Sequence, residues 1–168
     1  MTDAPSTSQI VQARVAVMLL AALVAGGALW YGVSFEDFGR LWKDILARPD
    51  GPMTFRFVLQ PAMAAIAALR DGIKDARLGR RPYLWALMRG VRSDQGRRGR
   101  LWEGIVATAR ILILGVVMDT VYQWLEFKTF YPVQAATIAS LLAFVPYLLL
   151  RGPVERIAQH WIARPASA

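Results

Sequence analysis

Two long runs of the chain carry no charged residue, and this feature constrains the fold more than any other. They cover residues 15–33, with 19 residues, and 129–150, with 22 residues. As helices rising about 1.5 Å per residue, they would measure about 28 and 33 Å, close to the ~30 Å hydrocarbon core of a bilayer. The sequence therefore predicts an all-α, polytopic membrane helix bundle.

Two further segments complete the predicted bundle. Residues 104–126 hold Arg110 near one end, from where its side chain can reach the interface. The second segment is uncharged only between Arg56 and Arg70, so it spans the bilayer only if both arginines extend outward, and a re-entrant or interfacial helix is the alternative. We expect about four transmembrane helices in a single membrane domain of residues 1–168, at 15–33, 53–70, 104–126 and 131–150.

The first span also has an alternative interpretation as a cleavable signal peptide. Small residues at positions 25–28 resemble a cleavage site. The flank before the apolar run holds only Asp3 and Arg14, however, which is a poor basic region, and the run is long for a signal peptide. We therefore expect a transmembrane helix.

Two amphipathic segments flank these spans. Residues 35–47 place Phe38, Leu41 and Trp42 on one helical side, with acids and bases mostly opposite. Residues 153–163 similarly gather Ile157 and Trp161 on one side. Both segments are predicted to be interfacial helices that lie in the plane of the membrane surface.

The charges of the connecting segments are distributed unequally. Residues 70–103 carry ten basic and four acidic residues, a net of +6, whereas residues 34–52 carry a net of −1. The positive-inside rule makes 70–103 a basic cytoplasmic loop, with both termini cytoplasmic. The net charge of +8 therefore indicates membrane topology and no nucleic-acid partner. Anionic lipid is the predicted contact of Arg77, Arg80, Arg81, Arg97, Arg98 and Arg100.

A polar stripe interrupts residues 111–126, which are otherwise apolar. Asp119, Tyr122, Gln123 and Glu126 are spaced i, i+3, i+4 and i+7, which is one helical face. A carboxylate at this depth costs about 2.5–3.5 kcal/mol on insertion scales, so Asp119 should face protein or water. Glu126 is near enough to the interface to be solvated.

The partner of Asp119 must come from outside its own helix. Arg110 is nine residues away, half a turn out of phase, so it cannot pair with Asp119. Arg56 is one possible partner, and such a pair would hold a marginal second helix in place. The polar side chains of other spans are the remaining possibilities: Gln60, Gln134, Thr137 and Ser140. The stripe is then either a protonatable functional site or a buried network that fixes helix packing.

Several classes of chemistry have no support in the composition. The chain has no cysteine and one histidine, His160, which excludes thiolate metal sites and multi-histidine metal or haem sites. No nucleotide-binding, serine-hydrolase or zinc-protease motif occurs. We expect no catalytic residues, no metal and no cofactor, with a lipid-modifying enzyme as the weakest alternative.

Several short motifs between about residues 59 and 157 carry a family resemblance: Leu59-Gln60-Pro61, Arg70-Asp71-Gly72, Asp75-Ala76, Pro82-Tyr83-Leu84-Trp85, Asp119 with Tyr122-Gln123, and Pro146-Tyr147 with Arg151-Gly152-Pro153. In these the chain resembles a group of small, uncharacterised bacterial integral membrane proteins. The resemblance implies the bacterial inner membrane and no particular activity. It leaves the N-terminal third uncovered.

Together these features predict a small, non-enzymatic accessory, scaffold or assembly component of a membrane. Its predicted partners are the bilayer, anionic lipids and another membrane protein or a second copy. Ala135, Ala139 and Ala143 recur every four residues, a pattern that lets helices approach closely. The alternative is a proton- or ion-coupled transport element centred on Asp119.

Overall fold

The described residues form four helices and confirm the all-α prediction. The computed structural model describes residues 5–31, 39, 43, 54–80, 83 and 94–162, with the backbone alone for Tyr31 and 94–97. The helices are α1 (Thr7–Tyr31), α3 (Arg56–Arg77), α5 (Asp94–Glu126) and α6 (Pro132–Ile162).

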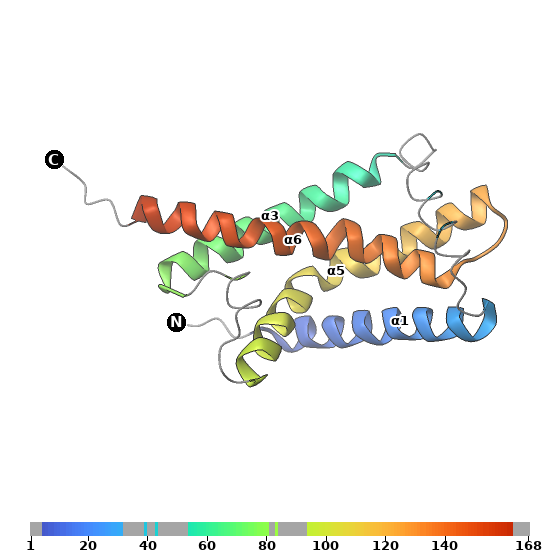
Figure 1. Cartoon of the computed structure of the whole chain (residues 1–168), viewed down its shortest axis with the longest axis horizontal. Helices are drawn as coiled ribbons and strands as arrows, with labels where there is room; N and C mark the ends of the chain where they lie inside the picture. The colour runs from blue at the N-terminus through green and yellow to red at the C-terminus, as the bar shows by residue number, and fades with distance from the viewer. Residues whose placement is uncertain are drawn as a thin grey trace.

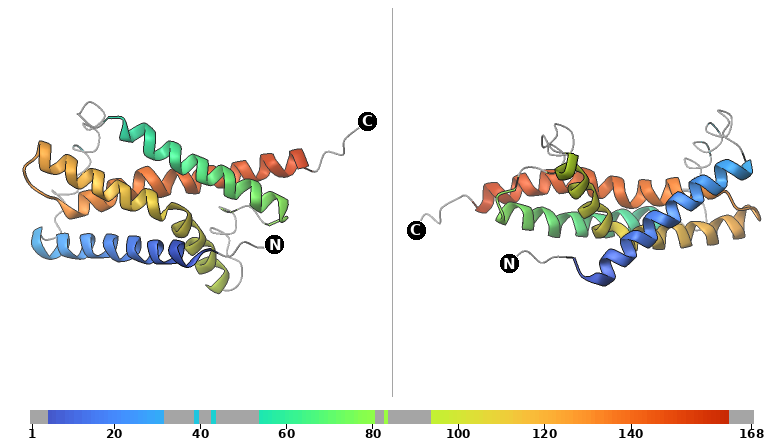
Figure 2. Two further views of the ribbon diagram at one scale, coloured as in Figure 1. Left: turned by 180° about the vertical axis from the view of Figure 1, so that it is seen from behind. Right: turned by 90° about the horizontal axis from the view of Figure 1, so that it is seen from below.

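The four helices alternate in direction along one bundle. α1 and α5 run one way, and α3 and α6 run the other, so α1 begins and α6 ends at the same end of the molecule (Figures 1 and 2). α3 packs most extensively on α6, α5 also packs on α6, and α1 packs on α5 and α6. α5 and α6 each contact all the other described helices, and α6 has the largest interface, with α3.

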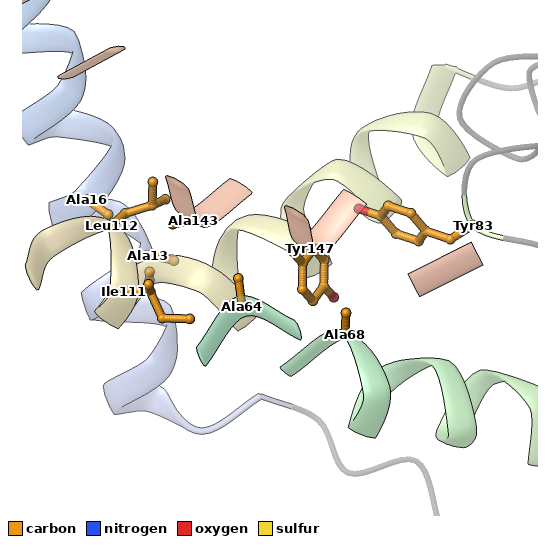
Figure 3. Close-up of a cluster of buried hydrophobic side chains, with 10 residues drawn as sticks. Ala13, Ala16, Ala64, Ala68, Tyr83, Ile111, Leu112, Ala143 and Tyr147 are labelled. Atoms are coloured by element: carbon orange, nitrogen blue, oxygen red, sulfur yellow. The ribbon is translucent and has the colours of Figure 1, made fainter. Parts of the chain in front are cut away.

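The centre of the bundle consists largely of small side chains. Ala13 and Ala16 of α1 are buried, as are Ala64 and Ala68 of α3, and they converge with Ile111, Leu112, Ala143 and Tyr147 (Figure 3). Small residues let helix backbones approach closely, which is how helices associate in a bilayer. At Gly72 of α3, an added Cβ would lie 3.0 Å from the carbonyl oxygen of Arg151, so only glycine permits this approach.

Large apolar side chains point outward. On α3 these include Val58, Leu59, Ile66 and Leu69, and on α1 they include Leu29, which is 88% exposed. A water-soluble protein buries such residues and exposes its charges. The opposite arrangement is expected of helices surrounded by lipid.

Three of the helices are long and apolar enough to cross a membrane: Thr7–Trp30 of α1, Arg98–Glu126 of α5, and α6. α3 is not among them. Its inward face carries Arg56, Gln60 and Asp75, and its outward face is apolar from Val58 to Leu69 but basic beyond, so its hydropathy is lower. Crossing by residues 53–70 stays a prediction.

The boundaries of two predicted segments differ from the structure. α3 continues to Arg77 and α5 begins at Asp94, so much of the predicted basic loop, 70–103, is helical. The helix continues because Gly72, Asp75 and Ala76 are buried, Gly72 directly against α6. Residues 153–162 continue α6 through Pro153 and do not begin a separate helix. The predicted interfacial helix at 35–47 lies outside the described residues, except for Gly39 and Lys43.

Candidate functional site

Asp119 lies inside the bundle on α5 and is 0% exposed. Its Oδ1 accepts a hydrogen bond of 2.5 Å from Nη2 of Arg56 on α3, and its Oδ2 accepts one of 2.5 Å from Nε2 of Gln123. Of the partners considered from the sequence, the structure thus places Arg56 against Asp119. The pair joins α3 to α5, and Gln123 follows one turn later on α5.

The neighbours of Asp119 tie this end of α5 to the start of α6. The backbone N–H of Tyr131 donates a 2.5 Å hydrogen bond to Oε1 of Gln123. The Tyr122 ring lies 5.9 Å from the Arg56 guanidinium carbon and packs edge-on against Phe127. Glu126 is exposed, as expected. Asp119, Tyr122, Gln123 and Arg56, all predicted site residues, therefore lie together.

Arg56 and its neighbour Gln60 leave hydrogen-bonding groups unused. Both residues are 1% exposed. Among the described residues, nothing bonds to Nε or Nη1 of Arg56 or to either amide atom of Gln60. Gln60 therefore does not bond Asp119. We call Arg56, Gln60, Asp119, Tyr122 and Gln123 the Asp119 cluster.

A second buried ionic cluster lies near the other end of α3, centred on Asp75. Its Oδ2 accepts hydrogen bonds from Nε and Nη2 of Arg151 on α6, at 3.0 and 2.6 Å. Arg100 of α5 donates to the same oxygen at 3.1 Å, and Arg80 donates to Oδ1 at 3.3 Å. One carboxylate therefore connects α3, α5 and α6.

Arg151 uses all three of its guanidinium nitrogens. Its Nη1 donates to the hydroxyl of Tyr147 at 2.6 Å, and that hydroxyl donates to Oδ2 of Asp71 at 2.6 Å. Its Nη2 also lies 3.2 Å from Glu103, whose side chain is 42% exposed and forms the edge of the network. We call Asp71, Asp75, Arg80, Tyr83, Arg100, Glu103, Tyr147 and Arg151 the Asp75 cluster.

Tyr83 covers this cluster from the segment between α3 and α5. Its ring centroid lies 4.2 Å from the guanidinium carbon of Arg151, and its hydroxyl donates to the backbone carbonyl of Arg100 at 2.6 Å. Its backbone N–H donates to buried Glu155 at 3.1 Å. Burial raises the pKa of Tyr83 to about 12, so the hydroxyl stays protonated at neutral pH.

Sequence reasoning missed the Asp75 cluster. In the sequence, Asp71 and Asp75 lie beside Lys74, a local pairing typical of a solvated helix end, and Arg151 directly follows the uncharged run 129–150. A signal was present: Gly72 and Asp75 follow Ala64 and Ala68 on one helical face, and Arg151 follows Ala143 and Tyr147 on another. Polar residues that extend a small-residue face are candidates for burial between helices.

The arginines predicted to contact anionic lipid divide into two groups. Arg77 and Arg98 are exposed, whereas Arg80 and Arg100 donate to Asp75 and Glu103 inside the cluster. Arg81 and the side chain of Arg97 lie outside the described residues.

The two clusters lie at opposite ends of the inward face of α3. Arg56 and Asp75 are 19 residues apart, about 28 Å along a helix. Between Gln60 and Asp71 this face carries Ala64 and Ala68, which Figure 3 shows against the other helices. Within the described part of the chain, no group of His, Cys, Asp or Glu side chains is arranged to hold a metal ion. The arrangement binds helices to one another at both ends.

Comparisons of the chain with protein-family models, with curated proteins and with solved structures found no match.

Proposed function

We propose that this chain is a four-span protein of the bacterial inner membrane, with both termini in the cytoplasm. The alternation of the helices and the outward apolar face of α3 support the fourth crossing. The basic excess of residues 70–103 supports the orientation, and the family resemblance supports the bacterial membrane.

We further propose a non-enzymatic, accessory role in which the protein acts through its surface. The two ionic clusters support this role because their side chains hold helices together. Asp119 is bonded to Arg56 and Gln123, and Asp75 is bonded to three arginines. A carboxylate that is already bonded to buried arginines is a poor general acid or base for catalysis.

The single observation that carries this proposal is the outward face of α1. Of its residues whose burial is described, the buried ones are Ala13, Ala16 and Gly27. The opposite side carries exposed Val11, Val15 and Met18 and continues through exposed Ala22 and Gly26. An apolar stripe that ends in the small residues Ala22 and Gly26 suits close packing against a helix of another membrane protein or a second copy.

Native mass measurement in nanodiscs or mild detergent tests this role. We expect the wild-type chain to form a defined complex, and Ala22→Phe to dissociate it by placing a large ring among the small residues of the stripe. Val24→Phe is the matched control, because Val24 is exposed on the flank of the same helix. A wild-type monomer in nanodiscs, or a complex unaffected by Ala22→Phe, would contradict the proposal.

Anionic lipid is the second partner we propose. At the Asp75 end of the bundle, the acids Asp75 and Glu155 are buried and Asp71 is bonded to Tyr147. The exposed charges on α3 and α6 are instead basic: Arg70, Lys74, Arg77 and Arg156. This segregation presents a cationic rim to lipid headgroups.

Proton- or ion-coupled transport remains the alternative, favoured by the buried carboxylate of Asp119 beside unused polar groups of Gln60. The apolar layer between the clusters opposes it, since Gln60 and Asp71 are separated by about 16 Å along α3. Transport predicts that Asp119→Asn leaves the protein level normal and abolishes proton flux into proteoliposomes. The accessory role predicts lower protein level or lower recovery of the complex.

A further inference from the structure

Two side chains on one face of α3 place unused hydrogen-bonding atoms inside the bundle. Arg56 and Gln60 are one turn apart and are each 1% exposed. Within the described part of the chain, Nε and Nη1 of Arg56 and both Gln60 amide atoms have no partner. Buried polar groups are almost always hydrogen-bonded, because a buried donor or acceptor without a partner lowers the free energy of unfolding.

Arg151, the buried arginine at the other end of the bundle, has a protein partner for each of its guanidinium nitrogens. Arg151 bonds through Nε, Nη1 and Nη2 to Asp75, Tyr147 and Glu103. Among the residues that the structure describes, Arg56 bonds to Asp119 through Nη2, and its Nε and Nη1 have no partner. The described residues therefore supply partners for every nitrogen of Arg151 but leave Nε and Nη1 of Arg56 without one.

The net charge of the Arg56–Asp119 pair, and the donors and acceptors of Arg56 and Gln60, indicate what kind of ligand would fit. Asp119 already neutralises Arg56, so an anion would bring an uncompensated charge into the bundle. Arg56 offers donors only, whereas the Gln60 amide offers both donors and an acceptor. The fitting ligand is small, neutral and able to both donate and accept hydrogen bonds.

Gly115 of α5 is an immediate neighbour of the Gln60 amide. A Cβ on Gly115 would lie 3.2 Å from Nε2 of Gln60 and 3.0 Å from Cβ of Ala139 on α6. A side chain at position 115 would therefore crowd the amide. Glycine lets the Gln60 amide pack directly against the α5 backbone, next to Ala139 of α6.

We propose that Arg56 and Gln60 bind ordered water in the interior of the bundle, beside the Arg56–Asp119 pair. Buried waters typically make about three hydrogen bonds to polar groups that otherwise lack partners. Such a water reduces the cost of keeping the ion pair at membrane depth. This proposal depends neither on the accessory role nor on transport.

The sign of one stability change tests the proposal. Gln60→Met keeps the length and approximate volume of the side chain and removes its polar atoms. If water bonds to the amide, the substitution lowers the Tm measured in nanodiscs, because those bonds are lost. If the amide is dry, the substitution raises the Tm or leaves it unchanged, and the proposal is overturned. Gln123→Met is the matched control, since its bonds to Asp119 and Tyr131 predict a lower Tm in either case.

A measurement on the wild-type protein avoids any dependence on variants. In 15N-labelled protein, we expect a cross-peak between water and the Nε proton of Arg56, recorded in a bilayer mimic that excludes bulk water. The Nε proton of Arg151 is the internal control, because it bonds to Asp75 and should lack that cross-peak. Absence of the Arg56 cross-peak would overturn the proposal even if Gln60→Met proved destabilising.

Discussion

The Asp119 and Asp75 clusters each contain a buried arginine and a buried aspartate, yet they are built differently. In the Asp75 cluster, three arginines from three parts of the chain surround one carboxylate, and Arg151 uses every nitrogen. In the Asp119 cluster, one arginine meets one carboxylate through one nitrogen. The first is a branched network, and the second is a pair with unused groups beside it.

This difference indicates that the two ends of α3 contribute differently to the bundle. Removing one member of a branched network affects several helices, because its neighbours lose a common partner. Removing both members of the Arg56–Asp119 pair also takes the Asp119 acceptor from Nε2 of Gln123, which keeps its bond to the Tyr131 carbonyl oxygen at 3.3 Å. A buried ion pair is weak evidence for net stability, and we infer that the Arg56–Asp119 pair serves to fix the position of α3 against α5.

The largest expected effect is at Arg151. Arg151→Met leaves Asp75 and Tyr147 without their main donor, and breaking a buried pair in this way costs about 3–5 kcal/mol. We expect a corresponding loss in the free energy of unfolding, measured by SDS titration in mixed micelles. Arg156→Met, at an exposed position on the same helix, should change it by less than about 0.5 kcal/mol. Equal effects at the two positions would show that the Asp75 cluster does not stabilise the bundle.

Double substitutions distinguish the pair from the network. Arg56→Met and Asp119→Leu should each be destabilising alone, by about 3 kcal/mol, because each removes the opposite charge from a buried ion pair. Together they should recover most of that loss. The combination of Asp75→Leu with Arg151→Met should not recover, since Arg80 and Arg100 also lose their acceptor. The measurement is a double-mutant cycle for each pair. Similar recovery in both cycles would show that the two clusters are equivalent.

A smaller effect is expected at Tyr147. Tyr147→Phe keeps the ring and removes the hydroxyl that accepts from Arg151 and donates to Asp71. Hydrogen bonds to charged groups contribute about 1.5–3 kcal/mol, so a loss of about 2 kcal/mol in unfolding free energy is expected by the same SDS titration. No loss would indicate that Asp71 lies outside the network.

The smallest effect is a change with pH at Tyr83. Its pKa is raised by burial to about 12, above the unfolded value near 10, so the folded state retains the proton longer. Its contribution to stability is complete below about pH 10 and is lost as the pH rises toward 12. Thermal unfolding between pH 9 and 11 should therefore show a steeper fall in Tm for the wild type than for Tyr83→Phe. Parallel curves would contradict a protonated, buried Tyr83.

The sequence predicted the parts of the molecule that depend on local pattern. Uncharged runs identified α1 and α6, and helical spacing placed Asp119, Tyr122 and Gln123 on one face. The depth of Asp119 in an apolar run also required a partner, which made Arg56 a candidate. These inferences rest on the helical spacing of residues and on the free-energy cost of burying a charge, both of which can be read from a single sequence.

The remainder depends on contacts between distant positions. Asp75 and Arg151 are 76 residues apart, and neither is unusual beside the local charges around it. Lys74 offered Asp71 and Asp75 an apparent partner, which concealed their burial. Pro153 likewise suggested a break, whereas the helix continues to Ile162 with Gly152 and Glu155 buried. Tertiary packing overrides these local signals, and the sequence does not show which helices meet.

Labelling the two ends of α3 tests the central claim most directly, namely that α3 crosses the bilayer with one ionic cluster near each side. The chain contains no cysteine, so Thr54→Cys and Leu78→Cys each provide a single reactive thiol. Both positions are exposed and flank the helix. A membrane-impermeant maleimide applied to intact spheroplasts should label position 54 and leave position 78 unlabelled, with the reverse in inverted vesicles. Labelling of both positions from the same side would show that α3 does not cross the membrane.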